Sequence, residues 1–406
     1  MDHSARASTS SASSTRVVDV LVPVALNQNY SYRVPRGMDL KPGDVVCVPL
    51  GPREVVAVVW AENANPDPRL HNRLKDVGEK LDVPPLKPEL RSLVDWVANY
   101  TLSARGMVLR MTLRMGEHLG PERVRMGVRL IGAAPKRLTP ARRRLIDMLS
   151  DGLLHGKAEA AREAGVSAGV IDGLVDEGTL TVEPMPRALP PPAPDPSFSQ
   201  PDFTSQQRIA VDAMRALAAN GSFHVALLDG VTGSGKTEVY FEAIAEVIRR
   251  EKQTLILMPE IALTGQFLDR FAARFGVRPL EWHSELTPRT RQRNWAAIAA
   301  GEAPVVVGAR SALFLPYGNL GLIIVDEEHD QAYKQDEGAH YHARDMAVVR
   351  AHIAKIPIVL ASATPSVETE VNARKGRYQR VVLPARFGGQ HMPHIEAIDL
   401  RRAAPP

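Results

Sequence analysis

The sequence predicts an α/β protein: a parallel sheet covered by helices, preceded by a small β-domain and a winged-helix domain. Three observations carry this prediction. Beyond residue 201, apolar strands alternate with helical segments, which is the pattern of a parallel sheet covered on both faces. Before it, short runs rich in Val and Tyr are separated by Pro/Gly turns. A proline-rich stretch, 185–200, separates the two parts and is expected to be a stiff linker.

The composition is that of a soluble globular protein with two to four domains. The chain has 406 residues, 44% hydrophobic and 24% charged. The single cysteine, Cys47, has no partner within the chain, and no CxxC motif occurs, which indicates a reducing compartment and no cysteine zinc site. No apolar run approaches the roughly 18 residues that span a bilayer. We expect a cytoplasmic monomer without a membrane segment, whose residues 1–15 form a disordered Ser/Thr/Ala-rich tail.

The β-rich domain is assigned to residues 16–115. Its strands are expected within 17–26, 30–35, 43–50 and 54–60, where Val and Tyr are frequent. A helix follows in 87–102, because Leu90, Leu93, Val94 and Val97 recur at helical spacing.

A basic stretch, 105–144, follows that helix. It contains eleven Lys and Arg residues but only two acidic residues, Glu117 and Glu122, so its net charge is +9. The overall net charge is only +4, so the excess is local. It predicts a surface that contacts phosphates, and an ordinary solvated basic face is the alternative.

The winged-helix domain is assigned to residues 116–184. Thr139 and Pro140 fit an N-cap followed by proline in the first helical turn. Residues 157–178 then read as helix, turn and helix, and 179–183 as a strand. Helix–turn–helix followed by a strand indicates a winged helix, with a purely structural helical spacer as the alternative.

A phosphate-binding loop is predicted at residues 230–237, GVTGSGKT. It follows an apolar strand and opens a helix, the context that a P-loop requires, whereas a glycine-rich turn could match by chance elsewhere. Glycines and backbone amides would wrap the phosphates, Lys236 would meet the β- and γ-phosphates, and Thr237 would ligate Mg²⁺. The nucleotide-binding candidates here are Gly230, Gly233, Ser234, Gly235, Lys236 and Thr237.

Acidic residues follow a second buried strand, LIIVDEEH, at its carboxyl end, where open α/β sheets bind ligands. Asp326 would hold Mg²⁺ through water, and Glu327 would position or deprotonate an attacking water. One alternative is a solvated acidic strand end. Another is a metal site that these acids form with His329, His340 and His342.

The tripeptide SAT follows the next apolar strand. The hydroxyls of Ser362 and Thr364 could bond His329 or Glu328 and relay the state of the nucleotide. Alternatively they simply end the strand.

The order P-loop, DEEH, SAT resembles the first RecA-like lobe of DExH-type helicases. Further stretches resemble the PriA (primosomal protein N′) family of replication-restart helicases: FTSQQRIAV from Phe203, LMPEIALTGQ from Leu257, EWHSELTPRTRQRNW from Glu281, VVVGARSALFLPYGNL from Val305, and YKQDEGAHYHARDMAVVRA from Tyr333. The resemblance covers nearly the whole chain. It departs at Gly265, where proline is common in the family.

The resemblance implies a RecA-like lobe over 201–406 that binds ATP and Mg²⁺. Its catalytic residues would be Lys236, Asp326, Glu327 and His329, and Gln207 would contact adenine. The β-domain would hold a DNA 3′ end, with Tyr30 as a stacking residue. Ser31 stands where some members have an acid, which weakens the case for base recognition there.

An aromatic-rich loop after the DEEH strand is implied to sense single-stranded DNA. Aromatic rings stack on bases without regard to sequence, and cations follow phosphates; the alternative is a packed loop with buried tyrosines. The DNA-contact candidates are Arg310, Tyr333, Lys334, Tyr341, His342 and Arg344.

The function implied is that of an ATP-dependent 3′→5′ DNA helicase of the restart primosome, associated with the nucleoid. Implied partners are forked and single-stranded DNA, primosome proteins, single-stranded-DNA-binding protein and the loader of the replicative helicase. The family's zinc-binding cysteines and second lobe do not occur in these 406 residues, so we expect either a fragment or a natural short form. Two alternatives remain: a non-catalytic fork-binding scaffold, and a RecQ-like or restriction-type translocase.

Overall fold

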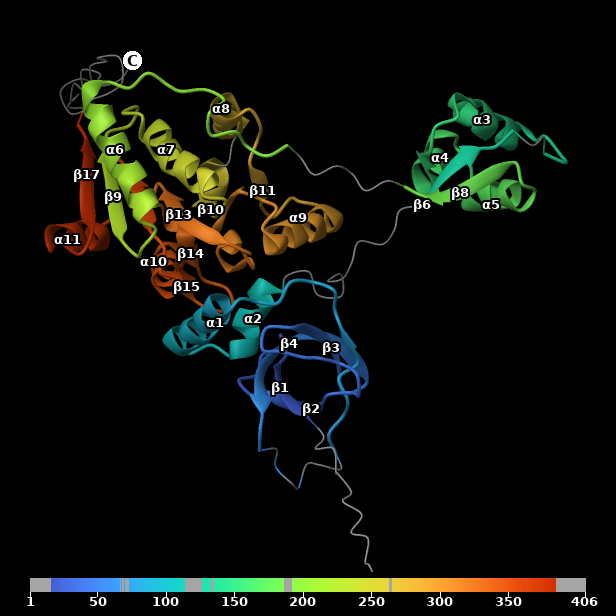
Figure 1. The fold of residues 1–406 in the computed structure, drawn as a ribbon, viewed down its shortest axis with the longest axis horizontal. Helices are drawn as coiled ribbons and strands as arrows, with labels where there is room; N and C mark the ends of the chain where they lie inside the picture. The colour runs from blue at the N-terminus through green and yellow to red at the C-terminus, as the bar shows by residue number, and fades with distance from the viewer. Residues whose placement is uncertain are drawn as a thin grey trace, which may run out of the picture. The chain divides into compact units, whose positions relative to one another are not determined.

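The computed structural model describes residues 16–65, 67, 69, 73–113, 126–132, 135–185, 192–262 and 265–384 (Figure 1). The chain divides into two compact units, residues 121–192 and the remainder, and each is described by itself. Among the described residues, no helix is long and apolar enough to cross a membrane. The predicted tail and Arg114, Arg123 and Arg125 of the basic stretch lie outside the described residues.

The first part of the larger unit is an antiparallel sheet in the order β2-β1-β4-β3-β5. Its strands are β1 (Val17–Leu21), β2 (Tyr30–Arg33), β3 (Val45–Leu50), β4 (Arg53–Asn63) and β5 (Glu79–Lys80). Val18, Val20, Val46 and Val48 alternate along their strands and share one buried cluster, as the period of two requires. The four predicted strands are confirmed.

Helices α1 (Pro88–Thr101) and α2 (Arg105–Thr112) join this sheet to the rest of the unit. The four predicted apolar positions of α1 are buried, in one cluster with the second sheet of the unit. The indole Nε1 of Trp295 donates to the backbone oxygen of Thr112 at 3.0 Å. The β-domain is therefore packed onto the helicase-like part, as Figure 1 also shows.

The second sheet is parallel and has the order β11-β12-β10-β13-β16-β9-β17. Its strands are β9 (Val225–Gly230), β10 (Gln253–Leu257), β11 (Leu280–Trp282), β12 (Val305–Gly308), β13 (Leu320–Asp326), β16 (Ile358–Ser362) and β17 (Gln379–Leu383). The central strands are almost continuously buried, which fits a parallel sheet covered on both faces.

Helices cover both faces of this sheet. One buried cluster joins it to α6 (Ser205–Asn220), α7 (Lys236–Arg249) and α8 (Gly265–Phe275). The other cluster joins it to α9 (Pro288–Ala300), α10 (Ala343–Ala354), α1 and α2. Short elements complete this part: η4 (Glu260–Ala262), η5 (Arg310–Phe314), η6 (Gln331–Tyr333), β14 (Lys334–Gln335), β15 (Tyr341–His342) and α11 (Val367–Arg374). The predicted parallel α/β class is confirmed.

The smaller unit packs three helices on a three-stranded antiparallel sheet in the order β7-β6-β8. Its elements are β6 (Met126–Leu130), α3 (Pro140–Met148), η3 (Leu149–Asp151), β7 (His155–Gly156), α4 (Lys157–Glu163), α5 (Ala168–Asp176) and β8 (Leu180–Pro184). Thr139 caps α3, because its side chain accepts from the backbone N–H of Arg142. Strand β6 was not predicted, since it lies within the basic stretch.

Several cations of the basic stretch are paired inside the protein. Arg129 pairs with Glu183, Arg142 with Glu177, and Arg105 with Asp95. All three acids lie outside residues 105–144, so a count restricted to that stretch overstates its positive surface charge.

Candidate active site

The P-loop connects the carboxyl end of β9 to the start of α7. Gly233 and Gly235 have positive φ angles of 80° and 88°, a conformation that glycine adopts without strain. A Cβ on Gly235 would lie only 2.6 Å from Nε2 of Gln207. Lys236 is buried, and its Nζ donates to the backbone oxygen of Gly230 at 2.9 Å. This hydrogen bond holds the Lys236 side chain against the first residue of the P-loop.

The hydroxyl of Ser234 is buried and has no hydrogen-bond partner in the described part of the chain. Buried polar atoms without partners are uncommon in folded proteins. An oxygen of a bound phosphate would satisfy this hydroxyl beside the backbone amides of the loop. Ser234 and the amides of the P-loop therefore fit the phosphates of a nucleoside triphosphate.

Gln207 braces the P-loop. Its side chain forms a capping box with Thr204 at the start of α6, in which Oε1 accepts from the Thr204 backbone N–H at 3.0 Å. Its Nε2 donates to the backbone oxygen of Ser234 at 2.9 Å. The second N–H of Nε2 is not used by these bonds, so the implied contact of Gln207 with adenine stays a prediction.

Asp326 ends β13 and is only 7% exposed. It accepts from the Tyr240 hydroxyl at 2.9 Å and from the Glu327 backbone N–H at 3.0 Å. Burial raises the pKa of this carboxyl to about 6, although the Tyr240 hydrogen bond opposes the shift. A divalent cation would relieve the cost of a buried negative charge, so the site fits magnesium.

Glu327 has a left-handed backbone with a φ of 47°, which is uncommon for a residue with a side chain and is frequent at functional sites. Its neighbours hold this turn. The Tyr333 hydroxyl donates to the backbone oxygen of Asp326, and the backbone N–H of Glu328 donates to Ala361. The Glu327 carboxylate is partly exposed and lies 3.6 Å from Nδ1 of His329.

Glu328 forms a buried network that the sequence did not indicate. Its carboxylate is fully buried and accepts from the Ser366 backbone N–H at 2.7 Å, the Ser366 hydroxyl at 3.0 Å and the Thr369 hydroxyl at 2.9 Å. Arg344 adds a contact at 3.2 Å. Ser366 caps α11, and the spacing S-x-x-T at that cap is the one sequence signal that could have drawn attention to it.

The predicted SAT contacts form in part. The Ser362 hydroxyl lies 2.8 Å from Nδ1 of His329, as expected. Thr364 is exposed, and its backbone N–H donates to Ser362. Glu328 is bound by Ser366 and Thr369 instead of the SAT hydroxyls.

Three predicted DNA contacts are contradicted by burial. Tyr333 is 1% exposed, and its hydroxyl donates to Leu257 and Asp326. Tyr341 is buried with its ring edge-on to Phe314, and Arg344 is buried beside Glu328. These side chains offer no surface for base stacking in this conformation, so the packed-loop alternative describes them.

The other DNA candidates are more accessible. Lys334 is exposed and lies 3.2 Å from Asp336. His342 is half-buried, and burial followed by the charge of Arg344 lowers its pKa. Arg310 is half-buried and donates to the backbone oxygens of Ala332 and Lys334.

Two further expectations concern Tyr30 and the histidine cluster. Tyr30 is half-buried at the start of β2, and the neighbouring Ser31 donates to the Asp19 carboxylate at 2.7 Å. In the described part of the chain, no three His, Cys, Asp or Glu side chains are arranged to hold a metal ion. The alternative metal site with His340 is therefore not formed.

Comparisons with known proteins agree with this geometry. Residues 19–114 match the PriA 3′DNA-binding domain, and residues 204–372 match the DEAD/DEAH box helicase domain. Replication restart protein PriA of Haemophilus influenzae is 34% identical in an alignment that covers 95% of this chain and 54% of that protein. PriA of Rickettsia felis is 33% identical over 388 residues, covering 95% and 49%.

PriA of Bacillus subtilis is 43% identical over 199 residues, covering 49% of this chain and 25% of that protein. The chain thus spans about half the length of the curated relatives it matches. A solved structure of RecG bound to a three-way DNA junction overlaps with a TM-score of 0.36 at 22% identity, over 47% of this chain and 25% of that one.

Proposed function

The chain belongs to the PriA family of replication restart proteins, and on this premise we propose that it is the DNA- and ATP-binding part of a fork-directed helicase. Its helicase domain supplies the nucleotide site. Its 3′DNA-binding domain supplies one of the DNA surfaces. The reaction is the ATP-dependent 3′→5′ separation of DNA strands during replication restart.

The observation that carries the proposal is the arrangement of Lys236 and Asp326. Both are buried at the carboxyl end of one parallel sheet, where such sheets bind ligands. Tyr240 of the P-loop helix bonds the Asp326 carboxylate, so the two halves of the site are held together. Lys236 and the loop amides would bind the β- and γ-phosphates.

Thr237 and Asp326 would hold magnesium, which when bound neutralises charge on the phosphates. Glu327 would orient or deprotonate the attacking water, since its carboxylate is accessible and its backbone is held on both sides. His329 and Ser362 would relay the state of the site to the SAT segment through their contact.

The DNA surfaces would be shared among three regions. The β-domain with Tyr30 would hold a 3′ end. The smaller unit would act as a winged helix on duplex arms, for which its three helices and three-stranded sheet are suited. Lys334 and Arg310 would contact single-stranded DNA. Primosome proteins, single-stranded-DNA-binding protein and a helicase loader are the proposed protein partners.

A second candidate is a fork-binding scaffold that uses the same DNA surfaces without turnover. The discriminating experiment compares ATP hydrolysis by the chain and by Lys236→Ala, each with and without forked DNA. If forked DNA stimulates ATP hydrolysis by the chain and the variant lacks this activity, the result supports the helicase hypothesis. If cells that carry Lys236→Ala restart replication normally, the result supports the scaffold hypothesis instead.

A further inference from the structure

Tyr240 connects the helix that follows the P-loop to the acidic end of β13. It lies on α7 and is fully buried. Its hydroxyl donates to Oδ2 of Asp326 at 2.9 Å, although the two residues are 86 positions apart. The bond therefore joins the two segments that carry the nucleotide chemistry, and it comes from a residue that belongs to neither GVTGSGKT nor LIIVDEEH.

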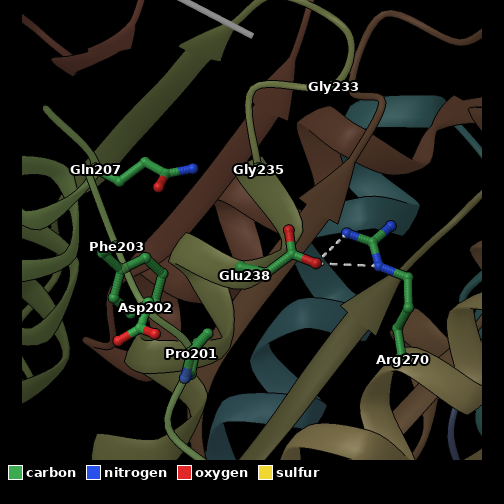
Figure 2. A pocket seen from close by; sticks show the side chains of 8 residues that line it. All are labelled: Pro201, Asp202, Phe203, Gln207, Gly233, Gly235, Glu238 and Arg270. Carbon is green, nitrogen blue, oxygen red and sulfur yellow. Dashed lines mark hydrogen bonds and ion pairs between the residues drawn. The ribbon is translucent and has the colours of Figure 1, made fainter. Parts of the chain in front are cut away.

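The start of α7 presents two different faces. Glu238 lines a pocket beside the P-loop and pairs with Arg270 at 2.5 Å (Figure 2). Tyr240 lies two positions further on, about 200° around the helix, and shares a buried cluster with the strands of the parallel sheet. A phenylalanine would fill this apolar space equally well, so the hydroxyl needs an explanation of its own.

The Asp326 side chain is held by two bonds and its backbone by a third. Tyr240 bonds Oδ2, and the backbone N–H of Glu327 donates to Oδ1 at 3.0 Å. The Tyr333 hydroxyl bonds the backbone oxygen of Asp326 at 2.5 Å. Each carboxylate oxygen can accept a second hydrogen bond. The carboxylate is therefore fixed in one orientation and still has room for the water molecules of a magnesium ion.

The other proposed magnesium ligand lies on the same face of α7 as Tyr240. Thr237 precedes Tyr240 by three residues, a spacing that makes side chains neighbours on a helix. The Thr237 side chain is in hydrogen-bond contact with the Tyr240 phenol. One phenol thus contacts both residues that would hold the ion. Magnesium demands nearly ideal octahedral geometry, so the relative placement of its ligands matters.

We propose that Tyr240 is a positioning residue for the magnesium site, whose phenol sets the placement of the Asp326 carboxylate relative to Thr237. The inference rests on the proposed function, because nucleotide and magnesium must bind between the P-loop and Asp326. Loss of a group that orients a metal ligand typically weakens metal binding by about 10–100-fold. Tyr240 would have this effect without touching the ion or the nucleotide.

Binding of a non-hydrolysable ATP analogue to the whole chain tests the inference. Its affinity is measured in EDTA and at one subsaturating concentration of free magnesium, and the ratio of the two affinities gives the enhancement by magnesium. Tyr240→Phe keeps the buried ring and removes only the hydroxyl. It should lower the enhancement about tenfold, while the affinity in EDTA stays that of the wild type.

Tyr317→Phe is the matched control. Tyr317 is also buried, and its hydroxyl donates to the backbone oxygen of Ala312 in η5 at 3.3 Å. This variant loses a buried hydrogen bond of another part of the fold, so it should keep the wild-type enhancement. Urea unfolding in EDTA establishes that both variants are folded.

A double-mutant cycle shows whether Tyr240 acts through Asp326. In Asp326→Asn the phenol no longer has a carboxylate to hold, so adding Tyr240→Phe should change the enhancement by less than about twofold. The same loss in both backgrounds would overturn the inference, because the phenol would then act on the fold in general.

The outcomes also separate the inference from the proposed function. A wild-type enhancement that Tyr240→Phe retains would overturn the positioning role alone. Failure of the wild type to bind the analogue, with or without magnesium, would overturn the proposed function and the positioning role with it.

Discussion

The carboxylate of Glu328 accepts a hydrogen bond from the backbone N–H of Ser366 at 2.7 Å. This bond joins the turn after β13 to the N-cap residue of α11, next to the SAT segment. Arg344, at the start of α10, contacts the same carboxylate. The starts of α10 and α11, which both follow the acidic motif, are therefore bound to one buried side chain.

Removal of that side chain should destabilise the protein. Glu328→Ala leaves the buried Arg344 without its fully buried partner, and breaking such a pair costs about 3–5 kcal/mol. Urea unfolding measures the loss. The control is Glu368→Ala, because Glu368 lies 3.9 Å from Arg344 and is largely exposed, so its loss should change the free energy of unfolding little. Equal effects of the two substitutions would contradict the buried network.

Asp326→Asn should stabilise the metal-free protein at high pH. The folded-state pKa of Asp326 is raised to about 6 from 3.8, so the folded protein holds this proton more tightly than the unfolded chain. Stability is therefore lost as pH rises from about 4 to 6, by about 3 kcal/mol at most. The variant escapes this loss. Thermal unfolding in EDTA should show it more stable than wild type at pH 8 and similar near pH 4.

Tyr333→Phe should weaken the fold without weakening DNA binding. The substitution keeps the buried ring but removes the hydroxyl that bonds Leu257 and Asp326. Leaving buried acceptors unpaired costs about 1–3 kcal/mol, which chemical denaturation measures. Affinity for single-stranded DNA, measured by fluorescence anisotropy, should stay within about twofold of wild type. A large loss of DNA affinity with an unchanged free energy of unfolding would instead show that Tyr333 contacts DNA.

Magnesium and ATP should stabilise the wild-type protein through Lys236. A ligand at about 100 times its dissociation constant adds about 2.7 kcal/mol. Differential scanning fluorimetry should show an increase in melting temperature that Lys236→Ala lacks and that EDTA reduces. If the melting temperature of Lys236→Ala rises as much as that of the wild type, the nucleotide binds outside the P-loop.

Contiguous motifs are what the sequence predicts best. GVTGSGKT and LIIVDEEH each carry their chemistry in a few neighbouring residues beside an apolar strand, so both motifs could be assigned to strand ends. The parallel sheet followed from the alternation of apolar strands and helices, because that pattern depends only on local periodicity.

Contacts between distant residues could not be predicted in the same way. Glu328 and Ser366 are 38 positions apart, and nothing in either local sequence specifies their partner. Tyr333 and Tyr341 have residue types that suit both DNA stacking and a core, and only packing shows that they are buried. The basic stretch looked more positive than it is, because the acids that pair with it lie elsewhere in the chain.

Preferential binding of this chain to a DNA fork can be measured by competition. The chain would be bound to a labelled fork with a free 3′ end and titrated with an unlabelled fork or a plain duplex of equal length. The fork should compete at about tenfold lower concentration than the duplex. Equal competition by the two would contradict it.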